Sequence, residues 1–173
     1  MPDSLTGVRV AFVFAGPLRN AVHTLKYHRV RRMARPLGAL IAAELTGWPV
    51  MADAVIPIPM HRDRLSERGF NQSEALAAEV ARLARLPLIN DHLIRVRATA
   101  QQAGLDMRGR RENVRGAFEW QRGTPPRRAV LIDDVLTTGS TMGACAEALR
   151  AAGTEEVYGL ALARSRPDLD TIP

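Results

Sequence analysis

Two adjacent carboxylates, Asp133 and Asp134, are followed closely by a turn that is rich in hydroxyl groups. Ionised carboxylates accept hydrogen bonds and donate none, so the natural partners of this acid pair are hydroxyl groups or a cation. In the turn, threonine and serine hydroxyls can donate to phosphate oxygens, and the glycine lets the backbone approach a ligand closely. We call this turn the hydroxyl turn; its members are Thr137, Thr138, Gly139, Ser140 and Thr141.

The flanking residues predict the elements that position these groups. Ala129 to Ile132 form an unbroken apolar run, which is typical of a parallel strand covered on both faces. From Met142 onwards the apolar residues recur at the spacing of one helix face, and Gly153 is a fitting end signal. A strand, a tight turn and a helix in this order bring unpaired backbone N–H groups and the positive end of the helix dipole to one point, which favours anions. Hydrogen-bond donors that suit a phosphate therefore lie beside hydrogen-bond acceptors that suit a diol. This combination predicts a phosphorylated ribose as the ligand.

An ordinary strand-turn-helix connection with solvated aspartates is the alternative interpretation of the same segment. Such a connection has no need of two carboxylates followed by small hydroxyl residues at a helix N-terminus. We therefore favour a ligand site over a plain connection.

Arginines cluster in two other parts of the chain. The apolar segment 53–59 predicts a core strand, and the segment 61–69 just beyond it carries Arg62, Arg64 and Arg68. In an open α/β sheet, the carboxyl ends of the strands are where ligands bind. The segment 95–116 is polar, lacks periodicity and holds six more arginines, so we expect a lid or binding loop there. For this second group, simple solvation of the arginines is an equally good interpretation.

Composition narrows the class of protein. With 173 residues, 46% of them hydrophobic and 24% charged, the chain is expected to form a single globular domain, 1–173, without a metal or disulfide staple. The formal charge of +6 favours anionic ligands such as phosphates, nucleotides or nucleic acid. No apolar run approaches the roughly 20 residues of a membrane helix, so we expect a cytoplasmic protein without membrane insertion. The histidines show no metal-ligand spacing, and the single Cys145 is expected in the core.

The remaining periodicities predict a helical hood followed by a core. A short strand at 8–14 and two helices, the second starting at Pro36, make up an expected hood of residues 1–50. The expected core, residues 51–165, adds a helix capped by Asn71 with Leu76, Val80 and Leu83 as its buried stripe. Two further strands are predicted, at 86–89 and 156–163.

The segment Val130 to Thr141 resembles the phosphoribosyl pyrophosphate (PRPP) motif of type I phosphoribosyltransferases. In that motif an acidic pair contacts the ribose hydroxyls and the following loop holds the 5-phosphate. From about Gly16 to Arg164 the chain is also similar to the ComF-like competence proteins, a branch of the same group. The residues that carry this likeness are Lys26-Tyr27, Pro57 to Gln72, Arg97 with Thr99 and Gln102, Asn113 to Phe118, and Asp133 to Thr141.

The resemblance implies an α/β fold with a type I phosphoribosyltransferase-like parallel twisted sheet flanked by helices and a small N-terminal helical hood. It also implies a pyrophosphate-contacting loop at 59–69 and a flexible loop over the active site at 97–115. Many members begin with a four-cysteine zinc ribbon, whereas this sequence holds one cysteine. Either the protein naturally lacks that module or the sequence is truncated, and zinc binding is therefore not carried over. Thr137 stands where the 6-oxopurine transferases place a carboxylate, which argues against their loop general base.

On this basis the expected function is transfer of a phosphoribosyl group to or from a nitrogenous acceptor, with pyrophosphate as leaving group. Asp133, Asp134, Arg62 and Arg64 would carry catalysis. The acid pair, the hydroxyl turn and Arg68 would bind PRPP or a ribonucleotide 5-phosphate. Mg²⁺ would be held mainly by the ligand's own oxygens and waters. The alternative is a non-catalytic protein that binds PRPP or a nucleotide, or that assists DNA uptake with DNA or competence-machinery proteins as partners. A homodimer is compatible with both.

Overall fold

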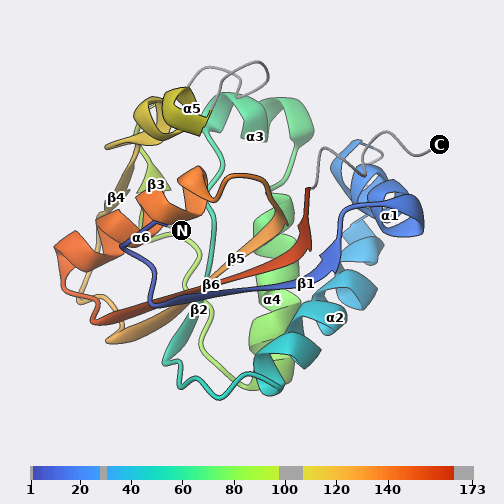
Figure 1. Cartoon of the computed structure of the whole chain (residues 1–173), viewed down its shortest axis with the longest axis horizontal. Coiled ribbons are helices and arrows are strands. Elements are labelled where there is room, and N and C mark those ends of the chain that lie inside the picture. The colour runs from blue at the N-terminus through green and yellow to red at the C-terminus, as the bar shows by residue number, and fades with distance from the viewer. Residues whose placement is uncertain (1, 28–30, 98–106, 166–173) are drawn as a thin grey trace.

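The computed structural model describes residues 2–27, 31–97 and 107–165 (Figure 1). Its helices are α1 (Gly16–Tyr27), the short 3-10 helix η1 (Arg31–Met33), α2 (Ala34–Thr46), α3 (Arg62–Arg68), α4 (Gln72–Ala84), α5 (Met107–Val114) and α6 (Ser140–Ala152). Its strands are β1 (Gly7–Val13), β2 (Ala54–Pro57), β3 (Leu93–Arg95), β4 (Phe118–Trp120), β5 (Arg128–Leu136) and β6 (Glu156–Arg164). Within these described ranges, no helix combines the length and apolar character needed to cross a bilayer.

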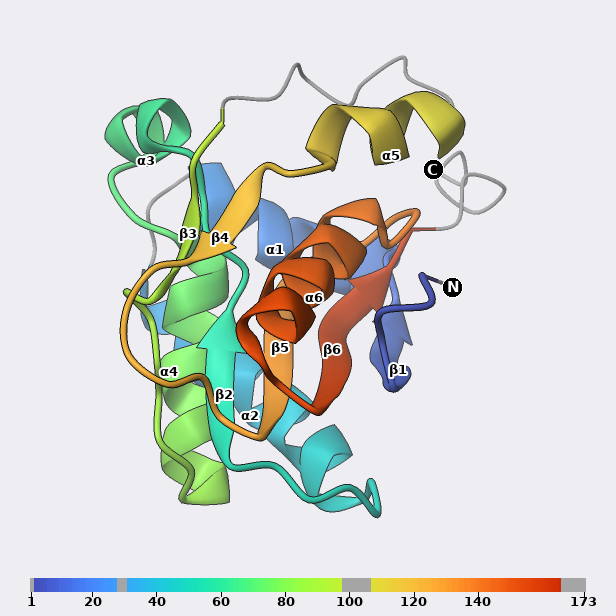
Figure 2. The ribbon, with the colours of Figure 1, turned by 90° about the vertical axis from the view of Figure 1, so that its left-hand side faces the viewer.

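A four-stranded parallel sheet forms the centre of the molecule, in the order β1-β6-β5-β2 (Figure 2). The predicted apolar run, 129–132, forms the buried middle of β5, which is paired on both sides. A strand covered on both faces is expected to be apolar throughout rather than alternating. The sheet flanked by helices confirms the predicted α/β fold class.

One face of the sheet is covered by α1, α2 and α4. Val130 and Ile132 of β5 and Leu160 and Leu162 of β6 are buried in the same hydrophobic cluster as these helices. These residues alternate along their strands, which puts their side chains on a single face. The predicted helix stripe is confirmed for Leu76 and Val80, which are fully buried, but Leu83 is 43% exposed and the prediction was wrong there.

The opposite face is covered by α6, which lies in front of the sheet in Figure 2. Leu131 of β5 is buried against Met142, Cys145 and Leu149 of the helix, so the expected core position of Cys145 is confirmed. A side chain at Gly159 of β6 would collide with Met142, so the missing Cβ is what allows the helix to approach the sheet. This close packing fixes the helix N-terminus relative to the end of β5.

The first fifty residues contribute to the sheet as well as to the helical layer. β1 pairs in parallel with β6 and forms an edge of the sheet, so the segment expected as a hood also supplies a core strand. The second helix begins at Ala34, two residues before the expected Pro36, because proline is tolerated in the first turn of a helix. The strand expected at 86–89 is reduced to an isolated parallel bridge between Val55 and Leu88.

Two segments expected as loops are partly regular. The loop implied at 59–69 contains α3, because the His61 ring accepts a hydrogen bond from Asp63 N at the start of the helix and Gly69, at φ 81°, ends it. Within the segment 95–116, α5 forms, and the strands on either side of this segment, β3 and β4, pair antiparallel. Residues 98–106, which include Thr99 and Gln102 of the expected flexible loop, lie outside the described residues, as do His28 and the tail from 166 onwards.

Candidate functional site

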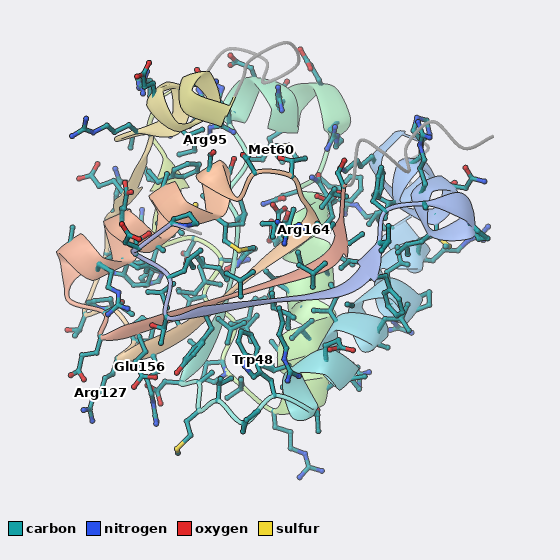
Figure 3. All side chains as sticks on the ribbon, in the orientation of Figure 1. Trp48, Met60, Arg95, Arg127, Glu156 and Arg164 are labelled. Atoms are coloured by element: carbon teal, nitrogen blue, oxygen red, sulfur yellow. The ribbon has the colours of Figure 1, made fainter. Side chains whose placement is uncertain are left out.

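A cavity of about 400 Å³ lies at the carboxyl ends of β2 and β5, which we call the site cavity. α3 and α5 lie beyond this end of the sheet in Figure 2, and Figure 3 labels Met60 and Arg95, two of the lining residues. Most of the residues singled out in the sequence meet here. These are Arg64, Arg68, Asp133, Asp134, Thr137 and Thr141.

The acid pair belongs to β5 itself, which continues beyond the aspartates to Leu136. Asp134 is buried, and its Oδ2 lies 2.5 Å from Nζ of Lys26 at the end of α1. Asp133 has different partners: its Oδ1 accepts hydrogen bonds from Ser73 Oγ and from the backbone N of Asp134, both at 2.9 Å. One carboxylate is therefore held by a cation and the other by uncharged donors.

The surroundings of Asp133 perturb the ionisation of its carboxyl group. Loss of hydration in the cavity wall, followed by the neighbouring charge of Asp134, raises the pKa of Asp133 to about 7. The Lys26 ammonium and the Ser73 hydroxyl act in the opposite direction because they favour the ionised form. Asp133 therefore changes its charge in the neutral pH range, where a ligand would meet it.

The hydroxyl turn leads directly into α6. Gly139 adopts φ 78° at the N-cap, a conformation that glycine reaches without strain. Thr138 Oγ1 lies 2.8 Å from Ser140 Oγ and accepts a hydrogen bond from Ser140 N at 3.4 Å. A small hollow of about 20 Å³ lies in the turn, lined in part by Thr137, Gly139, Ser140 and Thr141. The predicted arrangement of strand, turn and helix N-terminus is confirmed, so the turn lies at the positive end of the helix dipole.

The arginines of α3 separate into two groups. Arg64 and Arg68 both line the site cavity, and Arg68 donates to Gln72 Oε1 at 2.8 Å. Arg62, expected beside them, lines a neighbouring cavity of about 660 Å³ together with Arg122, which we call the side cavity. Residues four apart share one face of a helix, whereas residues two apart do not, so the helical form of this segment explains the separation.

The start of α4 supplies polar groups to the site cavity that the sequence analysis did not predict as site residues. Asn71 is confirmed as the N-cap: its side chain accepts from Ser73 N at 3.1 Å and donates to Ile58 O at 3.0 Å. Gln72 and Ser73 are buried as well, and the Ser73 hydroxyl reaches Asp133. The sequence did carry a signal for these site residues, because three consecutive polar residues stand at a helix start directly after the arginine segment.

Arg95, on β3, lines both the site cavity and the side cavity. Its guanidinium lies 5.4 Å from the ring centre of Phe118. Burial, followed by the nearby charge of Arg64, lowers the pKa of Arg95 from its ordinary value. From the sequence, solvation and a binding role were equally good interpretations of this arginine. The structure places it between the site cavity and the side cavity.

Comparison with known proteins finds relatives over most of the chain. Competence protein F of Haemophilus influenzae is 33% identical over 157 residues, which cover 86% of this chain and 69% of that protein. DNA utilization protein YhgH of Escherichia coli O157:H7 is 34% identical over 157 residues, covering 88% of this chain and 69% of the relative. Competence protein ComFC of Streptococcus pneumoniae is 33% identical over 110 residues, covering 63% and 47%. No family model matches the chain.

Two solved structures were also found by comparison of folds. The protein TT1426 from Thermus thermophilus aligns with TM-score 0.44 and 18% identity, over 75% of this chain and 83% of that one. A hypoxanthine phosphoribosyltransferase from Staphylococcus aureus aligns with TM-score 0.39 and 11% identity, over 80% and 64%. Family membership rests on the sequence relatives, which share about a third of their residues with this chain over more than two thirds of their own length. The chain belongs to the ComF-like competence protein family.

Proposed function

We propose that this protein binds PRPP and transfers its phosphoribosyl group to or from a nitrogenous acceptor, with pyrophosphate as leaving group. One observation carries the proposal. A single cavity brings diol acceptors, part of the hydroxyl turn at a helix N-terminus, and two arginines together at the carboxyl end of a parallel sheet. The three parts match the three parts of PRPP, which are a diol, a 5-phosphate and a pyrophosphate.

Each group has a role in this proposal. The ribose hydroxyls would donate to the acid pair, and the 5-phosphate would lie on the amides and hydroxyls of the hydroxyl turn. Displacement at the ribose C1 develops negative charge on the departing pyrophosphate, which Arg64 and Arg68 would stabilise from fixed positions. Arg62 faces the side cavity instead, so we propose no contact between Arg62 and this ligand.

Mg²⁺ would accompany PRPP rather than reside in the protein. The described residues contain no group of three or more histidine, cysteine or acidic side chains placed to hold a metal ion. One of the two aspartates in the cavity is already paired with Lys26. The oxygens of PRPP and water would therefore complete the coordination of a cation that keeps its hydration shell, and the cation would neutralise charge on the pyrophosphate.

The test is a calorimetric titration of PRPP with Mg²⁺ into the wild type and into the double variant Asp133→Asn with Asp134→Asn. We expect saturable binding to the wild type and none to the double variant, because the amides replace both anionic acceptors. Glu119→Gln is the matched control, since it removes an exposed carboxylate of β4 outside the cavity. Equal affinity in the double variant would exclude the proposed site, and Mg²⁺-dependent release of pyrophosphate with an added base would establish the enzyme.

A non-catalytic role in DNA utilization is the second candidate. It is supported by the names of the relatives, Competence protein F and DNA utilization protein, and by the net charge of +6. Contacts to DNA phosphates would make affinity fall steeply with salt. DNA binding of this kind that PRPP does not compete with, together with no pyrophosphate release, would favour this role over the enzyme.

A further inference from the structure

Lys26 is the only lysine of a chain that carries 24 lysine and arginine residues, and it lies in the site cavity. It occupies the last turn of α1, and its Nζ is 2.5 Å from Asp134 Oδ2. The lysine side chain is 21% exposed and the aspartate side chain 5%. A compact ammonium group is thus built into the wall where the ribose diol is proposed to bind.

The choice of lysine over arginine has a chemical consequence. A guanidinium is a planar fork that pairs with both oxygens of a carboxylate. An ammonium is a point charge with three donors that can turn toward more than one acceptor. At this position a lysine can hold Asp134 Oδ2 and still leave the other carboxylate oxygen for a ligand.

Two adjacent carboxylates without a cation would form an attractive site for a divalent metal ion. Hard cations such as Mg²⁺ are coordinated by carboxylate and water oxygens. A second uncompensated carboxylate in the partly dehydrated site cavity would strengthen the attraction for such an ion. The ammonium beside Asp134 removes one of the two charges and occupies the space next to its oxygen. A metal ion entering the acid pair would have to displace it.

We propose that Lys26 determines the specificity of the acid pair: its ammonium stands in for a divalent cation at Asp134, so that the pair accepts ligand hydroxyl groups and rejects a free metal ion. This inference rests on the proposed function for the identity of the hydroxyl ligand, whereas the exclusion of the metal ion is independent of it. Lys26 acts through Asp134 and is therefore a positioning residue.

The first test measures Mn²⁺ binding by electron paramagnetic resonance in the absence of PRPP. We expect Lys26→Met to bind Mn²⁺ about tenfold more tightly than the wild type, or better, the scale of one removed neighbouring charge. Adding Asp134→Asn to Lys26→Met should abolish the gain in Mn²⁺ affinity. Lys26→Arg keeps a cation beside Asp134 and should therefore show the Mn²⁺ affinity of the wild type. Arg19→Met is the matched control, because it removes a cation from the same helix at an exposed position outside the cavity. A gain in Lys26→Met no larger than that in Arg19→Met would overturn the proposal.

A second test needs no variant and decides the question if Lys26→Met does not fold. Reductive methylation with a ¹³C label marks only Lys26 and the N-terminal amine and preserves their charge. We expect PRPP with Mg²⁺ to shift the Lys26 methyl signal and Mn²⁺ alone to leave it sharp. Paramagnetic broadening of that signal by Mn²⁺ alone would contradict the exclusion. If PRPP has no effect but Lys26→Met still gains Mn²⁺, the proposed function fails and the exclusion stands.

Discussion

The two walls of the site cavity are built from different kinds of sequence. The carboxylate wall, made of β5, the hydroxyl turn and α6, comes from one continuous stretch, 128–152. The arginine wall, made of α3, the start of α4 and β3, combines segments that are separated along the chain. The first wall offers carboxylates, hydroxyls and helix amides, and the second offers guanidinium groups. The comparison shows that local sequence can specify a strand, a turn and a helix start, whereas the position of the arginines opposite them depends on tertiary structure.

Among single substitutions, those in the arginine wall have the largest expected effect. Replacing Arg64 or Arg68 by methionine removes a guanidinium group that we propose to contact the pyrophosphate. Charge-assisted hydrogen bonds of this kind contribute about 1.5–3 kcal/mol. We therefore expect PRPP affinity, measured by calorimetry, to fall by about 10- to 100-fold in each variant.

Arg62→Met is the matched control, because it removes the same charge from the same helix but from the side cavity. Its PRPP affinity should stay close to that of the wild type. If Arg62→Met loses as much affinity as Arg64→Met, the ligand uses the side cavity and the division between the two arginine groups is wrong.

The carboxylate wall should respond to pH where the arginine wall does not. Since the pKa of Asp133 is raised to about 7, its carboxylate is mostly protonated at pH 6 and mostly ionised at pH 8. An ionised acceptor binds hydroxyl groups more strongly. PRPP affinity should thus rise as pH increases through about 7, by up to about tenfold between these limits.

The same shift makes a prediction for the unliganded protein. The native state keeps a proton on Asp133 that the unfolded chain, with the ordinary aspartate pKa of 3.8, has already released. The contribution of this group to stability therefore decreases as pH rises from about 4 to about 7. Asp133→Asn should remove the contribution of this group to the pH dependence of PRPP affinity and to the pH dependence of stability. Unchanged pH profiles in that variant would show that another group titrates.

The smallest expected effect concerns the hydroxyl turn as a backbone feature. Gly139→Ala places a Cβ on a residue at φ 78°, a left-handed conformation that costs other residues about 1–2 kcal/mol. Gly47→Ala is the matched control, since Gly47 has φ −80° at the end of α2 and its added Cβ would make only ordinary contacts. Urea denaturation should show the loss in Gly139→Ala alone. Equal stability of the two variants would mean that the turn relaxes without strain.

Much of the carboxylate wall was predictable because its signals are contiguous. The apolar run at 129–132, the acid pair and the small residues of the turn follow one another, and each fits the local geometry of a strand, a turn or a helix start. The order of the sheet was less accessible, since the pairing of β1 with β6 joins the two ends of the chain.

The arginine wall was harder to predict for physical reasons. The resemblance implied a loop at 59–69, and only the helical form of residues 62–68 sends Arg62 away from Arg64 and Arg68. The partners of the acid pair are also distant in sequence: Ser73 reaches Asp133 from the start of α4, and Lys26 comes from α1. No spacing rule predicts contacts of this kind, which follow from the packing of helices on the sheet.

We propose that the carboxylate wall and the arginine wall bind opposite ends of one PRPP molecule, and a crystal structure of the complex with PRPP and Mg²⁺ would test this arrangement. We predict the 5-phosphate at the hydroxyl turn, the ribose hydroxyls within hydrogen-bond distance of Asp133 and Asp134, and the pyrophosphate between Arg64 and Arg68. A ligand bound in the side cavity, or one whose ribose makes no contact with the acid pair, would contradict the account.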